Sequence, residues 1–207
     1  MKNQIAIETK ILPDADAVAK EAAKVIAAEA RAAVAARRPF VMAASGGHTP
    51  WQMLRALAHE TVPWESVHVV QVDERIAPAG APDQNLTHLR ESLLEHAPLP
   101  ARRVYAMPVE EVDAEGAAQT YAYTLQQVAG TPPVLDLAHL GLGPDGHTAS
   151  LVPNDPVLNV ADRDVPVTGI YQNRRRNDTD LSHAQSLSSN PVGSDRSRKG
   201  GDACASS

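Results

Sequence analysis

Short apolar runs alternate with longer stretches of helical periodicity along most of this 207-residue chain. The apolar runs have the length and composition of buried strands, and the segments between them carry apolar residues at helical spacing. The predicted strands are 39–45, 67–72, 103–107 and 135–142. The predicted helices are 14–37, 50–59, 85–96 and 113–129. This alternation predicts an α/β domain with a mainly parallel sheet that helices cover on both faces.

The first predicted helix is Ala-rich, and Asp14 or Asp16 can cap its start. Its larger apolar side chains recur at helical spacing and suggest the buried face. They are Val18, Val25, Ile26 and Val34.

Charge and composition exclude several classes of protein. The net charge of −6 argues against a nucleic-acid partner, which would require clustered Lys and Arg. No stretch reaches the roughly 18 apolar residues of a membrane span, and the first ten residues lack a signal-peptide core. The single cysteine, Cys204, fits a reducing compartment, although it also fits a mere scarcity of cysteines. We expect a cytoplasmic protein with no membrane partner.

The composition changes after about Gly169. Residues 170–207 contain eight Ser, six Lys or Arg and four Asp, with few large apolar side chains. Such a segment buries little surface, so we expect one folded domain over 1–169 and a disordered Ser/Arg-rich tail over 170–207. A basic run of this kind is usually solvated, and a binding arm is the alternative.

A glycine-rich loop, "SGGHTP", follows the strand at 39–45. Gly46 and Gly47 allow backbone angles that expose successive N–H groups. Thr49 is placed to cap a helix, with Pro50 as its first residue and Gln52 completing a capping box. A helix start facing the end of a strand is suited to bind phosphate, and an ordinary turn is the alternative.

Two further loops carry polar residues after strands. In "VDERIAP", Asp73, Glu74 and Arg75 follow an apolar strand, so some of these charges should lie at the edge of the sheet. An arginine there can hold a phosphate or a developing oxyanion, and a solvated charged loop is the alternative. Asn85 lies where the next helix needs a cap.

The third loop, "GLGPDGH", fits the spacing of a dinucleotide fingerprint, but Asp145 would lie beside the pyrophosphate. Pro153 and Pro156 also leave too little helix after it, so the cofactor interpretation fails. What remains is Asp145 and His147 on a turn freed by glycine, where a neutral imidazole can take a proton. A structural histidine is the alternative.

Together, "ASGGHTP", "VDERIAP" with "DQNLTHLRESLL", and "HLGLGPDGHTASLVP" resemble the 6-phosphogluconolactonase family over about residues 5–169. The resemblance implies a Rossmann-like fold and hydrolysis of 6-phosphoglucono-δ-lactone to 6-phosphogluconate in the pentose phosphate pathway, without metal or cofactor. It implies four residues at the sugar and its reacting carbonyl: Asp73, Arg75, Asp145 and His147. It implies phosphate or substrate binding by Ser45, Gly46, Gly47, His48, Thr49, Asn85 and Gly146.

The chemistry of a lactone assigns roles to these residues. His147 would take a proton from the attacking water, Asp145 would orient the imidazole or shape the turn, and Arg75 would serve the phosphate or the oxyanion. A phosphate held at a remote site would fix the carbonyl against His147. The substrate is then the only partner we expect, and the favoured oligomeric state is a monomer.

The resemblance ends where the family continues with further strands and helices, including a "TGxxK"-like stretch. Here "VPVTGIYQNRRRN" leads into the Ser/Arg-rich tail, so the C-terminal part of the family fold is expected to be missing. Two alternatives stay open. One is a glucosamine-6-phosphate deaminase, which shares the Gly-Gly loop and the D-G-H turn, and the other is a sugar-phosphate-binding domain without catalysis.

Overall fold

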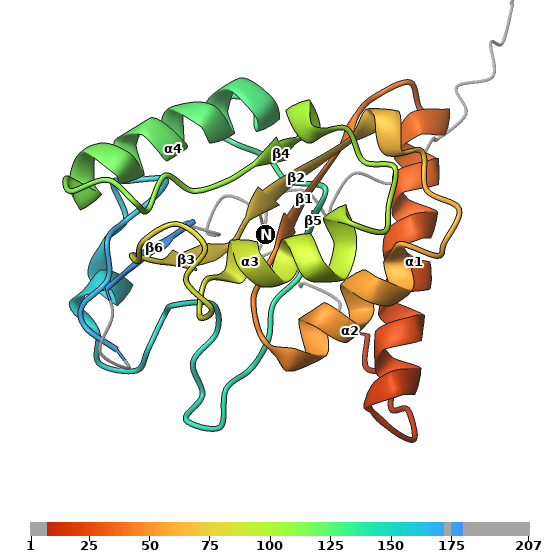
Figure 1. Cartoon of the computed structure of the whole chain (residues 1–207), viewed down its shortest axis with the longest axis horizontal. Coiled ribbons are helices and arrows are strands. Elements are labelled where there is room, and N and C mark those ends of the chain that lie inside the picture. Colours follow the sequence, from red (N-terminus) through yellow and green to blue (C-terminus); the bar gives the residue numbers. More distant parts are fainter. Residues whose placement is uncertain (1–7, 172–174, 180–207) are drawn as a thin grey trace, which may run out of the picture.

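The structure is a computed structural model that describes residues 8–171 and 175–179. At its centre is a parallel four-stranded sheet with strand order β4-β2-β1-β5 (Figure 1). Its strands are β1 (Phe40–Ala44), β2 (Val67–Gln71), β4 (Val104–Tyr105) and β5 (Leu137–Ala138). The α-helices are α1 (Ala15–Ala35), α2 (His48–Leu57), α3 (Asn85–Leu89) and α4 (Ala114–Ala129). Shorter turns of helix are Trp64–Ser66, Arg90–Leu94, Ala101–Arg103 and Pro156–Asn159.

Helices cover both faces of this sheet, as the alternating pattern predicts. Along β1, Phe40 and Met42 point into a core shared with α1 and α2. The residues between them, Val41 and Ala43, point the opposite way, into a second core that includes Tyr121 of α4. In Figure 1, α4 lies on one side of the strands and α1 and α2 lie on the other. The α/β fold with a mainly parallel sheet is therefore confirmed.

Alanines, and not the valines of the sequence pattern, form most of the buried face of α1. Val18 is 41% exposed and Val25 is 49% exposed. Small side chains allow α1 to pack closely on α2 and the sheet. The prediction is therefore confirmed for Ile26 and wrong for Val18 and Val25. The predicted cap is confirmed, because Asp14 is the N-cap and its side chain accepts a hydrogen bond from the Ala17 amide (2.8 Å). The buried residues of α1 are Ala19, Ala23, Ile26, Ala27, Ala30 and Ala33.

The second helix begins earlier than its capping pattern predicts. Its first residue is His48 and its N-cap is Gly47, whose φ of 114° lies in the region that favours glycine. No side chain caps this start, so the predicted box of Thr49 and Gln52 is wrong, and Pro50 is the third helical residue. The backbone conformation of Gly47 thus starts the helix without a capping side chain.

A two-stranded antiparallel sheet lies beyond the end of β2. Its strands are β3 (Asp73–Arg75) and β6 (Arg176–Asp178), and the register pairs Glu74 with Asn177. The predicted boundary at residue 169 is therefore wrong for residues 175–179, of which 176–179 are buried. This strand is held by backbone pairing and polar contacts, so a count of apolar residues gave no sign of it. Residues 180–207, with Cys204, lie outside the described residues.

Within residues 8–171 and 175–179, no helix combines the length and apolar character that crossing a bilayer requires.

Candidate active site

Three loops meet beyond the carboxyl ends of β1, β2 and β5, which share one edge of the parallel sheet. The loop after β1 touches the start of α3, because a Cβ atom at Gly46 would lie 1.9 Å from the Asn85 Oδ1. The loop after β5 touches β3, where the Ser150 hydroxyl donates to the Asp73 Oδ2 (2.6 Å). The three motifs of the sequence therefore lie side by side in the folded chain.

The glycine loop presents backbone N–H groups at the start of α2. Ser45 is buried at the end of β1, whereas His48 and Thr49 are exposed in the first turn of the helix. Amides in the first turn have no acceptor within their own helix, and the helix dipole makes this end positive. The loop can thus bind an anion such as a phosphate group.

Asp73 is a buried carboxylate that joins two of the loops. Its side chain is bonded on one oxygen to Ser150 and on the other to the Asn85 amide nitrogen (3.3 Å). The guanidinium of Arg176 lies 3.9 Å from its Oδ2. Burial raises the pKa of Asp73, and the hydrogen bond from Ser150 and the charge of Arg176 act against that rise. Asp73 is therefore a buried link between β3, the loop after β5 and the start of α3.

Glu74 is fully buried. It belongs to the "VDERIAP" motif, but the motif itself does not indicate its role. Its Oε1 accepts hydrogen bonds from the amides of Arg75 (2.8 Å) and Asn85 (2.7 Å). Its Oε2 accepts from the Leu86 amide and the Gln71 side chain, both at 2.7 Å. Burial raises the pKa of Glu74 and these donors oppose the rise. The carboxylate thus fixes the start of α3 to β3.

Arg75 and Asn85 form a polar bridge beside the glycine loop. The Arg75 Nη1 donates to the Asn85 Oδ1 (2.9 Å) and to the Asp83 carbonyl (2.6 Å). Asn85 is the first residue of α3 and Gln84 is the N-cap, so the predicted capping role of Asn85 is wrong. Its amide nitrogen donates instead to the Asp73 carbonyl (2.9 Å). Arg75 also lies near a second cation, Arg176. Burial of the Arg176 guanidinium lowers its pKa, and the positive charge of Arg75 lowers it further.

Asp145 and His147 form a pair on the loop after β5. The His147 Nδ1 lies 2.5 Å from the Asp145 Oδ1. Their side chains are 22% exposed for His147 and 40% exposed for Asp145, so solvent and small molecules can reach them. The hydrogen bond with His147 lowers the pKa of Asp145. An imidazole that donates from Nδ1 to a carboxylate has its lone pair on Nε2, where it can accept a proton.

Glycines shape the turn that carries this pair. The Gly143 amide donates to the His147 carbonyl (2.8 Å), and the Gly146 amide donates to the Gly143 carbonyl (3.0 Å). Gly146 has a φ of 87°, which few other residues adopt. A Cβ atom at Gly143 would lie 2.2 Å from two atoms of the His147 ring, so no side chain fits there.

Two residues that the sequence assigned to the tail region complete the site. The Tyr171 hydroxyl donates to the Asp145 Oδ2 (3.1 Å), and the guanidinium of Arg176 lies 5.2 Å from the Tyr171 ring centre. Arg176 also contacts Asp73, so a continuous series of contacts joins the exposed pair to the buried cluster. Sequence reasoning missed both residues because the composition of residues 170–207 suggested no packing.

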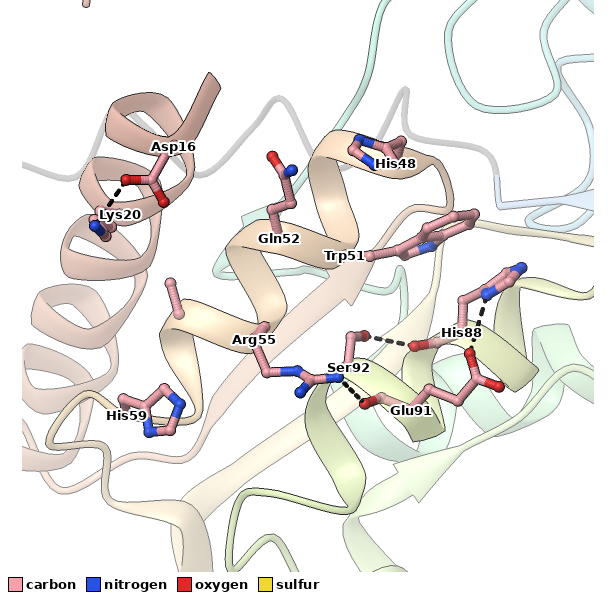
Figure 2. A pocket seen from close by; sticks show the side chains of 11 residues that line it. Asp16, Lys20, His48, Trp51, Gln52, Arg55, His59, His88, Glu91 and Ser92 are labelled. Carbon is pink, nitrogen blue, oxygen red and sulfur yellow. Dashed lines mark hydrogen bonds and ion pairs between the residues drawn. The ribbon is translucent and has the colours of Figure 1, made fainter. Parts of the chain in front are cut away.

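The His48 side chain lies apart from this series, in a groove of about 530 Å³ formed by α1, α2 and the helical segment 85–94 (Figure 2). Trp51 and His88 stack in this groove with their ring centres 3.7 Å apart. The groove is lined by Asp16, Lys20, His48, Trp51, Gln52, Arg55, Ala56, His59, His88, Glu91 and Ser92. The predicted contact of His48 with phosphate stays a prediction.

No three His, Cys, Asp or Glu side chains converge as metal ligands within the part of the chain that the structure describes.

Comparison with known proteins identifies the family. The family model described as glucosamine-6-phosphate isomerases/6-phosphogluconolactonase matches residues 13–183. The chain belongs to this family. The match covers all three loops of the site and includes β6.

Relatives within the family are named for the lactonase. The 6-phosphogluconolactonase of Synechocystis sp. is 42% identical over 139 residues, which are 65% of this chain and 58% of that protein. That of Nostoc sp. is 33% identical over 162 residues, 76% of this chain and 68% of that protein. The crystal structure of 6-phosphogluconolactonase from Thermotoga maritima has a TM-score of 0.71 at 25% identity, covering 81% of this chain and 74% of that one. This chain thus spans little more than half of its Synechocystis relative.

Proposed function

We propose that the chain hydrolyses 6-phosphoglucono-δ-lactone to 6-phosphogluconate. The observation that carries the proposal is the exposed pair of Asp145 and His147 on a glycine-shaped turn, in a chain of this family. The deaminase interpretation is less favoured, because the Synechocystis and Nostoc relatives are both named 6-phosphogluconolactonase. The compartment stays a prediction, since named relatives include a chloroplastic and an endoplasmic protein.

In this proposal His147 is the general base. Its Nε2 takes a proton from a water molecule as the water oxygen attacks the lactone carbonyl carbon. The tetrahedral intermediate then collapses, the bond from the carbonyl carbon to the ring oxygen breaks, and His147 returns the proton to that oxygen. Asp145 holds the imidazole by its Nδ1 and stabilises the positive charge that His147 carries between the two steps.

The phosphate is assigned to the loop of Ser45 to Thr49, because the first amides of a helix such as α2 have no acceptor within the helix and favour an anion. Arg75 is assigned to the phosphate and not to the oxyanion, because its partner Asn85 touches Gly46 of that loop. Asp73 is assigned a positioning role, because it is only 3% exposed and bonded to Ser150 and Asn85. Binding the phosphate away from the carbonyl would lower the entropic part of the barrier.

A product assay tests this proposal. The purified chain is given 6-phosphoglucono-δ-lactone and, separately, glucosamine 6-phosphate, and each rate is corrected for the reaction without protein. We expect 6-phosphogluconate from the first substrate and no ammonia from the second. Ammonia release would identify a deaminase, and binding of 6-phosphogluconate without turnover would identify a binding domain.

A further inference from the structure

Tyr171 touches both members of the exposed pair. Its hydroxyl donates to the Asp145 Oδ2 (3.1 Å), while the other oxygen of that carboxylate holds the His147 Nδ1 (2.5 Å). The Tyr171 and His147 rings lie 5.5 Å apart and are tilted by 58°. The carboxylate is thus held on both oxygens, although its residue is exposed.

Arg176 fixes the position of the Tyr171 ring. Its guanidinium lies 5.2 Å from the ring centre, a distance at which a cation is attracted to an aromatic face. Arg176 belongs to β6 and is buried, so it is a rigid anchor. The half-buried Tyr171 ring therefore contacts both this anchor and the imidazole.

We propose that Tyr171 is a positioning residue for the base, because its hydroxyl fixes the Asp145 carboxylate and, through it, the orientation of the His147 ring. This inference rests on the proposed hydrolysis. An exposed carboxylate with one partner rotates about its own bonds, whereas a second donor on its other oxygen restricts that rotation. The imidazole then keeps Nε2 directed toward the substrate, which lowers the entropic part of the activation barrier.

The same contact affects the charge of the pair. A donor to a carboxylate stabilises its ionised form, so Tyr171 adds to the lowering of the Asp145 pKa that His147 causes. Among residues 8–171 and 175–179, the groups that face Asp145 are His147 on its own loop and Tyr171, and Arg176 contacts the Tyr171 ring.

Kinetics of Tyr171→Phe test the role directly, since this change removes the hydroxyl and keeps the ring. We expect kcat for the lactone to fall about fivefold, on the scale of one hydrogen bond, while KM changes less than about twofold. The matched control is Tyr123→Phe, which alters a 63% exposed tyrosine on α4 and should leave both constants unchanged. An unchanged kcat in Tyr171→Phe would overturn the proposal.

A double-mutant cycle tests whether Tyr171 acts through Asp145. In an Asp145→Asn background, adding Tyr171→Phe should lower kcat by much less than the fivefold seen in the wild-type background. If the two effects multiply independently, Tyr171 does not work through this carboxylate and the proposal fails.

A measurement that needs no turnover separates this inference from the proposed function. The ¹³C signal of the Asp145 carboxyl carbon is followed against pH in the wild type and in Tyr171→Phe. Loss of the donor should raise the pKa of Asp145, whereas Tyr123→Phe should not. If the wild type shows no lactone hydrolysis, the proposed function fails, and an unchanged Asp145 titration in Tyr171→Phe would overturn the positioning role separately.

Discussion

The two polar regions at the edge of the sheet are built in opposite ways. Around β3, Asp73 and Glu74 are nearly free of solvent contact, and Glu74 accepts four hydrogen bonds from fixed donors. On the loop after β5, Asp145 is exposed and His147 is half-buried, and the Asp145 carboxylate is bonded to His147 and Tyr171. Both regions pair carboxylates with nitrogen donors, yet only the second can exchange protons freely with a substrate.

The difference indicates a division of labour. Burial raises the pKa of Asp73 and of Glu74, whereas a hydrogen bond lowers the pKa of Asp145. A buried carboxylate with all its acceptors used holds loops in place but reaches no ligand. A solvent-accessible pair can take a proton from a substrate through the imidazole Nε2, provided that neighbouring residues keep the pair in position. The predictions below test this division.

The largest effect is expected from removing the base. His147→Asn should lower lactone hydrolysis by about 10²-fold or more, the usual scale of general-base catalysis, because Asn cannot take up the proton. The melting temperature should stay within about 2 °C of the wild type, since the residue lies on an exposed turn. Near-normal turnover in this variant would remove His147 from the mechanism.

Glu74→Gln should act on stability first. In the wild type both Glu74 oxygens accept hydrogen bonds, whereas Gln replaces one of these oxygens with an NH₂ group that can only donate. Donors that face this NH₂ group lose their acceptor, so the free energy of unfolding should fall by about 2 kcal/mol or more. Denaturant unfolding measures the loss. The control is Glu111→Gln, an exposed position where we expect almost no change. If Glu74→Gln is as stable as the wild type, the Glu74 carboxylate does not stabilise the attachment of α3 to β3.

A pair of glycines on one loop tests the geometry of the exposed region. Gly143→Ala places a Cβ atom against the His147 ring and should lower the hydrolysis rate by about tenfold. Gly141→Ala is the matched control, because a Cβ atom there meets no atom within 4 Å. Equal rates for the two variants would show that the ring position does not limit the reaction.

The smallest expected effect is a difference in pH dependence between the two regions. The pKa of Asp73 is raised in the folded state, so its contribution to stability is present at low pH and is lost as pH rises above about 4. The pKa of Asp145 is lowered, so its contribution is present at neutral pH and is lost as pH falls.

Unfolding free energies of the wild type, Asp73→Asn and Asp145→Asn, measured from about pH 7 to about pH 3, check these signs, because the loss expected for Asp145 develops below the ordinary aspartate pKa of about 4. As the pH falls, the wild type should gain stability relative to Asp73→Asn and lose stability relative to Asp145→Asn. Slopes of the same sign would contradict the contrast between the two regions.

Much of the fold could be predicted because apolar periodicity reports directly on buried faces. The strands and helices of the central sheet follow that periodicity to within a few residues, and the parallel order brings the predicted loops to one edge. Where small residues do the packing, as the alanines of α1 do, the larger side chains mark the buried face poorly: Ile26 is buried as predicted, but Val18 and Val25 are exposed.

The site was predictable only where a motif signals its chemistry locally. Glycines beside Asp145 and His147 signal a special turn, and they led to the pair. Arg176 and Tyr171 depend on partners distant in sequence, such as the contact of Arg176 with Asp73, and no local pattern reports such contacts. Glu74 has its partners within twelve residues, but its role depends on how β3 and the start of α3 pack together. The polar strand β6 escaped notice for the same reason, because its partner β3 lies about a hundred residues earlier.

The most direct test of the division of labour is the dissociation constant of 6-phosphogluconate, measured by calorimetry for the wild type, His147→Asn and Gly47→Val. Val at a φ of 114° disturbs the loop assigned to the phosphate, whereas Asn at position 147 leaves that loop intact. We expect His147→Asn to bind within about twofold of the wild type and Gly47→Val to bind at least about tenfold more weakly. Loss of binding in His147→Asn, with unchanged binding in a folded Gly47→Val, would contradict the account.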